Sequence, residues 1–491
     1  MNYKKIKIVL FAVAIILLIP IIDANTINIT TEEGIKPNLV GIIYGSIWYV
    51  GGSEPGNFSK IQDAIDNASS GDTVFVYEDS SPYNENLIIN KTISLIGENK
   101  DTTVINGDSK KSVIVILAEY VHISGFSIQM TGPDEGTSGI SILKNFSLIS
   151  DNIILNNDWG IYIYNSFFNS IIRNKFLNND CGLSLRTSEN IIKDNQFFND
   201  GIYLISSGNI IENNTVNYKP LIYLENQDNK KIEYECGQII LMNCSSITIQ
   251  NQTISNTDIG IILSHCKNCI IENNSISESL SGISITYSDN NIIKFNDVFL
   301  NRNYGIYLYR SDYNILEYNS CIENTQGNWD HHGILLYRSN NNTIQKNHLD
   351  DNKVGIELDY SCDNIISENV ISYNIYIGFK LYYYSERNMI DSNYIMGNDR
   401  GGHLFGVSHN FITHNNFRNN DNDLVLEILQ YLKFSFKRFP IIDGNFWDKK
   451  RVFPRIFWGD FTFIYMDVPY GGYFTIRLPF IDWNPAKEPL F

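Results

Sequence analysis

The stretch GILLYRSNNNTIQKNHLDDNKVGIELDY, residues 333–360, contains one complete unit of a repeat and the beginning of the next. Gly333 is followed at its first and third positions by the apolar Ile334 and Leu336, and Gly355 starts the same pattern again. Between the glycines, a motif N-x-[apolar]-x-x-N-x-[apolar] places asparagines at 342 and 347 and aliphatic residues at 344 and 349. Apolar residues at alternate positions predict short strands that bury one face.

The same unit recurs along most of the chain. Most of its glycines follow one another at a nearly constant interval, but the interval from Gly305 to Gly333 is clearly longer than the others. A still longer interruption lies between Gly201 and Gly260, and within it we expect residues 225–235 to project as a loop. Self-similarity at a nearly fixed period is typical of a solenoid. The glycines that mark the units are Gly139, Gly160, Gly182, Gly201, Gly260, Gly282, Gly305, Gly333, Gly355 and Gly378.

Each unit has room for three very short strands separated by turns, and no room for a helix. A crossover α/β fold is excluded because parallel strands joined in that way need a dozen or more connecting residues. The chain can instead coil, so that each strand pairs in parallel with its equivalents in the coils above and below. The sequence therefore predicts an all-β, single-stranded parallel β-helix, a three-faced solenoid of about 22 residues per coil and about thirteen coils.

The asparagines fall where the path of the coil must bend. Their amides can bond to the turn backbone and to the amide of the next coil. We therefore expect the asparagines to form a ladder along the stack.

The pattern resembles the right-handed parallel β-helix of the pectin-lyase-like superfamily. PbH1 repeats of this kind occur in carbohydrate-binding and sugar-hydrolase domains and in NosD-type periplasmic copper-processing proteins. The resemblance extends from about Ile61 to Phe417. It implies a right-handed coil, and a groove on the outer side of one stack of strands where members of the superfamily process polysaccharides. It is specific for the fold and much less so for the function.

The ends of the chain differ from the repeat. Residues 1–24 combine three lysines, an apolar run and Ala24, which predicts a signal peptide or an N-terminal anchor. Residues 25–56 are expected to be a linker, and residues 57–420 to be the β-helix. Its N-terminal cap is expected to be a short helix that starts with a capping box formed by Ser59 and Gln62. Residues 421–491 lose the repeat and are rich in aromatic residues, which predicts a C-terminal cap.

Charge restricts the partners. The formal net charge is −17 at pH 7 and the sequence pI is about 4.9, which disfavours nucleic acid and anionic membrane surfaces. A membrane contact is expected only through residues 1–24, if they are not cleaved. Because residues 1–24 have the features of an export signal, the protein is expected to be extracellular, periplasmic or displayed on the cell surface.

The residues that point outward after each glycine supply the candidate site. They combine aromatic faces for sugar rings with basic groups for carboxylates. The longer unit that ends at Gly333 adds a protruding turn, TQGNWDHH, at the edge of this patch. The candidate ligand-binding residues are Trp329, Tyr307, Tyr309, Arg310, Tyr337, Arg338, Lys380 and Tyr382. The candidate catalytic residues, chosen for proton transfer, are Asp330, His332, Glu357 and Asp359.

These residues favour a surface protein that binds polysaccharide or cell-envelope material, or that acts as a cell-surface scaffold. The alternative is a lyase, hydrolase or uronate epimerase that acts on an acidic glycan. Asp330 and the two following histidines fit the Asp-x-His element of uronate epimerases only loosely. A further alternative, implied by the NosD resemblance, is a metal-processing accessory protein. The six methionines are scattered singly, so no metal site is assigned. Calcium is a possible cofactor, because carboxylates are its usual ligands.

Cysteines give a weaker signal. There are seven, and Cys244 and Cys266 are separated by one length of the repeat. They should therefore occupy the same place on adjacent coils, within disulfide distance although not ideally oriented. The motif CKNC, residues 266–269, lacks a second pair of ligands and is not expected to bind zinc.

Overall fold

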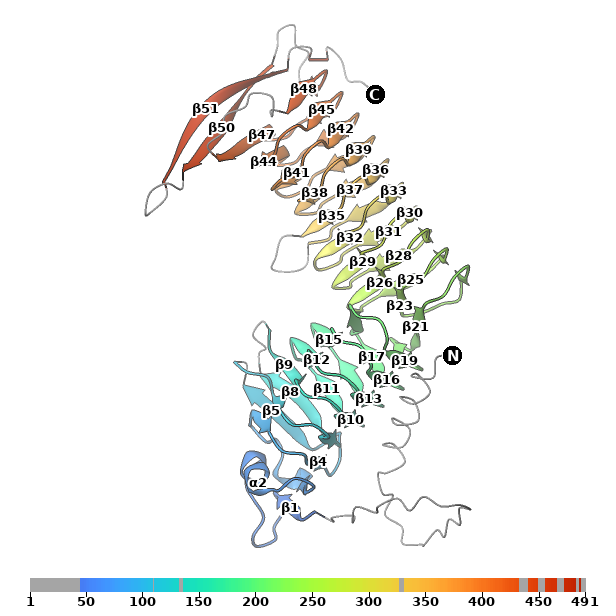
Figure 1. Ribbon diagram of the computed structural model, residues 1–491, viewed down its shortest axis with the longest axis vertical. Helices are drawn as coiled ribbons and strands as arrows, with labels where there is room; N and C mark the ends of the chain where they lie inside the picture. The colour runs from blue at the N-terminus through green and yellow to red at the C-terminus, as the bar shows by residue number, and fades with distance from the viewer. Residues whose placement is uncertain are drawn as a thin grey trace, which may run out of the picture.

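The protein is described here from a computed structural model, and Figure 1 shows its path. The structure describes residues 45–108, 110–131, 136–325, 331–431, 440–448, 455–465, 472–482 and 485–486. The expected signal peptide or anchor, residues 1–24, lies outside these ranges.

Residues 47–216, the first stack, form three parallel sheets named A, B and C. Sheet A contains β1 (Ile47–Val50), β2 (Thr73–Val76), β4 (Ser94–Gly97), β7 (His122–Ser124), β10 (Leu148–Ser150), β13 (Ser170–Ile172), β16 (Ile191–Lys193) and β19 (Ile210–Glu212). Sheet B contains β5 (Val104–Asp108), β8 (Ser127–Thr131), β11 (Ile153–Leu155), β14 (Lys175–Leu177), β17 (Gln196–Phe198) and β20 (Thr215–Val216). Sheet C contains β3 (Leu87–Ile89), β6 (Ile114–Ile116), β9 (Ser138–Ile142), β12 (Trp159–Ile163), β15 (Cys181–Leu185) and β18 (Ile202–Leu204).

Residues 219–482, the second stack, repeat this arrangement in sheets D, E and F. Sheet D contains β21 (Lys219–Glu225), β23 (Gln238–Met242), β26 (Ile259–Ser264), β29 (Ser281–Thr286), β32 (Tyr304–Tyr309), β35 (His332–Tyr337), β38 (Val354–Asp359), β41 (Ile377–Tyr382), β44 (Arg400–Phe405), β47 (Asn422–Tyr431), β50 (Arg455–Tyr465) and β51 (Gly472–Asp482). Sheet E contains β22 (Lys231–Ile232), β24 (Thr248–Gln250), β27 (Ile270–Glu272), β30 (Ile292–Lys294), β33 (Ile315–Glu317), β36 (Thr343–Gln345), β39 (Ile365–Ser367), β42 (Met389–Asp391), β45 (Phe411–Thr413) and β48 (Ile441–Asp443). Sheet F contains β25 (Thr253–Ser255), β28 (Ser275–Ser277), β31 (Asp297–Phe299), β34 (Ser320–Ile322), β37 (His348–Asp350), β40 (Val370–Ser372), β43 (Tyr394–Met396), β46 (Asn416–Arg418) and β49 (Phe446–Trp447).

The parallel β-helix with three faces is confirmed, but the stack has about 17 turns rather than about thirteen. The difference arises because the early coils, such as those of β3 and β6, have no marker glycine. The ordered stack also starts before residue 57, since β1 pairs with β2 along its length. Residues 225–235 are not simply a projecting loop, because β22 pairs with β24 in sheet E.

The repeat glycines lie in the strands of sheets C and D, except Gly201, which directly precedes β18. In β32, β35 and β38 the glycine is the second residue of the strand. A side chain on Gly355 would collide with the next coil, because its Cβ would lie 2.5 Å from the carbonyl oxygen of Gly378 and 2.7 Å from Ile371 Cγ2. The glycine is therefore required by close packing between coils rather than by an unusual backbone conformation. The alternate aliphatic residues, such as Ile356 and Leu358, are fully buried in the core.

Buried asparagines form columns that run along the stack. Asn347 is typical: its backbone N–H and its side-chain Nδ2 both donate to Asn369 Oδ1, at 2.9 and 3.0 Å. The same Nδ2 donates to the carbonyl oxygen of Leu316, at 2.9 Å. Each amide thus satisfies backbone groups that the turn leaves without a strand partner.

The two stacks do not continue into each other. β20 turns into β21 as an antiparallel pair, and β18 is the last strand of sheet C. The side chain of Gln238 takes the place of a further strand: Ile202 N donates to its Oε1 at 2.9 Å, and its Nε2 donates to Ile202 O at 2.9 Å. Ile240 and Ile262, which point outward from sheet D, pack into the core of the first stack. The outer face of sheet D therefore covers the end of the first stack, and the chain bends at β21 (Figure 1).

The N-terminal cap helix, α2 (Ile61–Asn67), is confirmed, and it buries Ile61, Ala64 and Ile65. The capping-box prediction is wrong: the N-cap residue is Lys60 rather than Ser59, and its side chain forms no capping hydrogen bond. The carboxylate of Glu85 accepts hydrogen bonds from Ile61 N and Gln62 N instead, at 2.8 and 3.0 Å. A short 3-10 helix, η1 (Glu78–Ser80), follows β2.

At the other end, β50 and β51 form an antiparallel hairpin beyond β47. Asp482 on this hairpin ends one asparagine column, since its carboxylate accepts hydrogen bonds from Asn445 N at 3.2 Å and from Trp447 Nε1 at 2.9 Å. Trp447 stacks on Phe417, with ring centroids 4.5 Å apart. The described part of residues 421–491 thus closes the last coils.

The cysteines Cys244 and Cys266 follow the paired residues Met242 and Ser264 by two positions, as their spacing predicts. Both are buried and both are free thiols. In later coils a serine occupies the equivalent position. Ser288 is the equivalent residue in the coil after Cys266, and Cys266 N donates to its Oγ at 2.9 Å.

Candidate functional site on sheet D

Strand register builds two outward columns on sheet D. The first column contains Tyr307, Leu335, Glu357, Lys380 and His403, each paired with the next. The second column contains Tyr309, Tyr337, Asp359, Tyr382 and Phe405. Because neighbouring strands lie about 4.8 Å apart, the side chains of each column contact one another.

A third row follows the strands. Its residues adopt left-handed backbone conformations that reverse the chain direction, with φ of 49° at Arg310 and 56° at Arg338. Non-glycine residues rarely adopt this conformation. Here the next coil supports it, because Arg310 N donates to Tyr337 O at 3.0 Å and Arg338 N donates to Asp359 O at 2.9 Å.

The rings of these rows form a continuous series, which we call the aromatic stripe. Ring centroids lie 5.0 Å apart for His265 and Tyr287, 5.4 Å for Tyr287 and Tyr309, and 5.7 Å for Tyr309 and Tyr337. The series goes on to Tyr360, at 6.1 Å from Tyr337. Its members are His265, Tyr287, Tyr309, Tyr337, Tyr360, Tyr382, Tyr383, Tyr384 and Phe405.

Guanidinium groups lie over the rings of the stripe. Arg310 lies 5.5 Å from the ring centroid of Tyr287 and 5.4 Å from that of Tyr309. Arg338 lies 5.3 Å from Tyr337 and 5.5 Å from Tyr360. Both arginines are exposed, and the rings hold the planes of their guanidinium groups. Arg310 Nη1 donates to the hydroxyl of Tyr287 at 3.2 Å, and the other donors of the exposed guanidinium groups can face a ligand.

A buried ionic cluster lies beside the stripe. Glu357 Oε2 is 2.7 Å from His332 Nε2 and 3.1 Å from Lys380 Nζ. Burial alone would raise the pKa of Glu357, but the hydrogen bond and charge of His332 and the charge of Lys380 lower it below its ordinary value. Glu357 is only 6% exposed, so it holds its two partners in place rather than facing solvent.

Asp359 is the more accessible acid of this region, since it is half-buried. Burial, and next the charge of Glu357, raise its pKa to about 6. Lys380 lies 4.2 Å from the ring centroid of Tyr382 and so connects the ionic cluster to the stripe. The cluster can hold a proton next to an aromatic surface.

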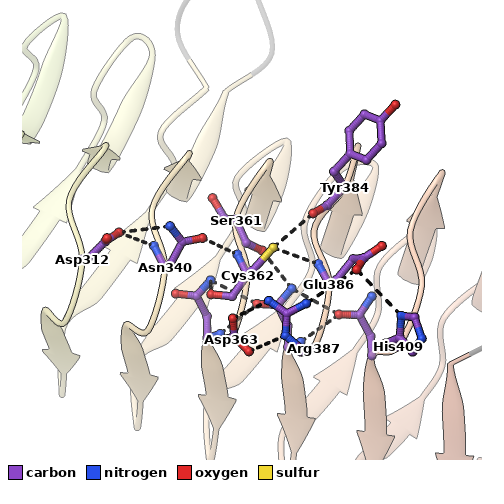
Figure 2. Close-up of polar contacts among 12 residues, drawn as sticks. Asp312, Asn340, Ser361, Cys362, Asp363, Tyr384, Glu386, Arg387 and His409 are labelled. Carbon is purple, nitrogen blue, oxygen red and sulfur yellow. Dashed lines mark hydrogen bonds and ion pairs between the residues drawn. The ribbon is translucent and has the colours of Figure 1, made fainter. Parts of the chain in front are cut away.

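A polar network supports the turns behind the third row (Figure 2). Asn340 N donates to Asp312 Oδ1 at 2.6 Å, and Cys362 N donates to Asn340 Oδ1 at 2.8 Å. Arg387 forms two hydrogen bonds with the carboxylate of Asp363, both at 2.7 Å. These bonds run from coil to coil and so fix the spacing of the turns that carry the arginines.

The structure brings together most of the residues that the sequence selects. Tyr307, Tyr309, Arg310, Tyr337, Arg338, Glu357, Asp359, Lys380 and Tyr382 lie on neighbouring strands or at their ends. Trp329 and Asp330 lie outside the described residues. His332 is not part of a protruding turn: it is the first residue of β35 and is 4% exposed.

Sequence reasoning missed His265, Tyr287, Tyr384, His403 and Phe405. His403 was missed because Gly401 is followed by a second glycine rather than by an aliphatic residue, although Gly401 follows Gly378 at the usual interval of the repeat. Gly402 makes room for an inward aromatic ring, since a Cβ there would lie 2.3 Å from Phe379 Cζ. The spacing alone would have identified this coil.

No group of three or more histidine, cysteine, aspartate or glutamate side chains in the described ranges is placed to hold a metal ion. The calcium that the sequence leaves open is not assigned to any of these residues. The described part of the chain also has no helix long and apolar enough to cross a membrane.

Two family models match the sequence. The first, described as a right handed beta helix region, matches residues 238–385. The second, described as periplasmic copper-binding protein (NosD), matches residues 65–235 and 322–451, which is more than half of the chain.

Among curated proteins, the chain is 39% identical over 72 residues to a cell surface glycoprotein of Methanothermus fervidus. That match covers 14% of this chain and only 12% of the glycoprotein. Among solved structures, a variant of the periplasmic alginate epimerase AlgG matches with 14% identity and a TM-score of 0.34, covering 73% of each chain. An alginate lyase from Paenibacillus matches with 13% identity and a TM-score of 0.26, covering 56% of this chain and 94% of that one.

Proposed function

Because the chain belongs to the family described as periplasmic copper-binding protein (NosD), it is a β-helix protein of the cell envelope or exterior, and we propose that it binds a polysaccharide along the aromatic stripe. The family description names copper, but the described residues offer no cluster that fits a metal ion. Copper chemistry therefore plays no part in the proposal.

The observation that carries the proposal is the unbroken run of ring contacts from His265 to Phe405 on one outer face of the stack. Side chains that point away from the core of a β-solenoid need not be aromatic for the fold to be stable. Tyr287, Tyr360 and Tyr384 expose 38%, 37% and 58% of their surface. A row of partly exposed rings suits the flat apolar faces of sugar rings.

The arginines favour a sugar that carries a carboxylate. Arg310 and Arg338 present planar donors at the edge of the stripe, and a guanidinium binds a carboxylate through two parallel hydrogen bonds. The net charge of −17 opposes a polyanion at long range, so the affinity must come from these short-range contacts. Moderate salt should therefore weaken binding less than it does for a basic protein.

The test is a glycan array followed by calorimetric titration with oligouronides, with and without calcium. Arg338→Ala should raise the Kd for an oligouronide about tenfold, as loss of a charge-assisted contact does. Because Arg338 is exposed, the melting temperature should change little. If the wild-type protein binds no glycan under either condition, the stripe is only a surface and the protein is a scaffold.

The ionic cluster favours a second candidate function, a lyase or epimerase that acts on the same acidic glycan. Asp359 has a pKa raised to about 6 and lies beside the stripe, which suits a general base or acid near neutral pH. His332 and Glu357 are buried and would act by holding Lys380.

For this alternative, the assay measures new unsaturated or reducing ends, or changed uronate stereochemistry, after incubation with the polymer. If turnover exists, Asp359→Asn should abolish it and retain binding. To test the role of His332, the variant His332→Gln is preferred to His332→Ala, because alanine would leave the buried Glu357 without this hydrogen-bond partner. Binding without any turnover would rule out the enzymatic alternative.

A further inference from the structure

The first stack carries an aromatic cluster of its own on the outer face of sheet C. The guanidinium of Arg186 lies 5.3 Å from the ring centroid of Trp159, 5.9 Å from Tyr162 and 5.8 Å from Tyr203. Trp159 and Tyr162 are in edge contact at 4.4 Å, and Tyr164 stacks on Tyr162 at 6.0 Å. These four rings and Arg186 form what we call the corner cluster.

The corner cluster repeats the chemistry of the aromatic stripe. Arg186 is exposed, and it forms no ion pair with a carboxylate of the described chain. Tyr164 exposes 47% of its surface. A cation held against several rings, with its donors free, is suited to bind a carboxylate on a sugar that stacks beside it.

The bend turns the face that carries this cluster toward the outer face of sheet D. Since Ile240 and Ile262 on the outer side of sheet D pack into the core of the first stack, the outer faces of sheets C and D meet at an angle. Tyr203 is close enough to Tyr307 to contribute to its raised pKa, for which burial is the main cause and Tyr304 the second. Figure 1 shows β12 and β15, and β32 and β35, on the concave side of the bend.

Contacts at the rim hold the two faces together. Arg302 lies in the turn that leads into β32, and Asp180 lies in the turn that leads into β15. Arg302 Nη1 is 2.6 Å from Asp180 Oδ1. Tyr304 stacks on Tyr307 with ring centroids 5.1 Å apart, and Tyr304 also contacts His332 at 5.8 Å. Tyr307 in turn stacks on Tyr309 of the stripe, with ring centroids 6.5 Å apart, so the sheet D side of this junction leads into the stripe.

We propose that the corner cluster is a second subsite for the same carboxylate-bearing polysaccharide, so that one long chain contacts both stacks and fastens the bend. The proposal rests on the function proposed above. It follows from the shared chemistry of the two surfaces and from the junction between them, where Arg302 pairs with Asp180 and Ile240 and Ile262 of sheet D pack into the first stack. A short oligosaccharide can occupy either surface alone, whereas a long one gains from both because the second contact is intramolecular.

The experiment is a calorimetric titration of the full chain with short and long oligouronides, of about 3 and about 12 sugar residues, chosen to occupy one subsite or both. Arg186→Ala should raise the Kd for the long oligouronide at least about tenfold, and should change the Kd of the short one less than about threefold. Trp159→Ala should behave in the same way. Arg186→Lys, which keeps the charge but loses the planar fork, should recover only part of the affinity.

The outcomes separate the two proposals. If the wild-type protein binds both oligouronides and Arg338→Ala weakens both, but Arg186→Ala weakens neither, the corner cluster is not a subsite while the stripe remains one. If the wild-type protein binds neither, the proposed function itself fails. A fall in melting temperature of Arg186→Ala that is as large as that of a core substitution would show that Arg186 is needed for packing, and would overturn the proposal.

Discussion

Glu357 Oε2 lies 2.7 Å from His332 Nε2, so a carboxylate from one coil and an imidazole from the preceding coil form a buried pair on the outer side of sheet D. The same oxygen lies 3.1 Å from Lys380 Nζ on the following coil. One carboxylate therefore links three successive coils.

Replacing Glu357 should be costly. Glu357→Ala leaves Lys380, whose side chain is 14% exposed, without its carboxylate. Breaking a buried pair by removing one partner costs about 3 to 5 kcal/mol, so we expect a loss of that order in urea denaturation. Asp359→Asn, which leaves this pair intact on the same strand, should cost less than about 1 kcal/mol. Equal losses in the two variants would contradict a structural role for the pair.

The asparagine columns should be sensitive to a loss of polar groups. Asn347→Leu removes the acceptor of Asn319 N and the donor to Leu316 O, both fully inside the stack. Leaving such groups without partners costs about 1 to 3 kcal/mol in the free energy of unfolding. The matched control is Asn341→Gly, because Asn341 is exposed and has a φ of 56° that glycine adopts readily. The column would be unimportant if both changes had the same small effect.

Stability should fall as the pH rises, because of two buried carboxyls at the junction of the stacks. Asp258 accepts hydrogen bonds from Gly182 N at 3.1 Å and Gly201 N at 3.1 Å, and burial raises its pKa to about 6. Burial, and next the charge of Asp258, raise the pKa of Asp200 to about 9. A carboxyl whose pKa is raised on folding stabilises the folded state fully below its unfolded pKa of about 4, and this contribution is lost as the pH rises through the folded value.

We therefore expect the melting temperature to decline between about pH 4 and pH 9, with Asp258 acting up to about pH 6. Asp258→Asn keeps an oxygen that can accept the bonds of Gly182 N and Gly201 N, and it removes the charge. It should flatten the decline between about pH 4 and pH 6, and raise the melting temperature at pH 8. A pH profile parallel to that of the wild-type protein would show that Asp258 does not titrate in this range.

The periodic part of the fold could be predicted from the sequence because each coil repeats the same inward pattern. Ile334 and Leu336 lie in the core as their spacing predicts, and the outward columns follow from the same alternation. The cap helix could also be placed, but not its capping group. Glu85 reaches Ile61 N only after the chain has completed a coil, so no local motif reveals it.

The bend and the corner cluster could not be predicted, because they depend on contacts that have no period. Gln238 bonds to Ile202 in the other stack, and Arg302 pairs with Asp180, which is still more distant in the sequence. The burial of Glu357 could not be predicted either. The alternation of the strand shows that its side chain points outward, but not that neighbouring side chains cover it. His332 reaches Glu357 from the start of the preceding strand, outside the columns that the alternation defines.

The central claim is that the aromatic stripe binds polysaccharide, and calorimetric titration of two matched double variants tests it most directly. Tyr309→Ser with Tyr337→Ser breaks a stacked pair of the stripe, whose centroids lie 5.7 Å apart. Phe295→Ser with Tyr318→Ser breaks a stacked and more exposed pair on another side of the coil, at 5.0 Å. The account predicts that the first variant raises the Kd for an oligouronide at least about tenfold and the second by less than about twofold. Equal effects of the two double variants, or no loss of binding in the first, would contradict it.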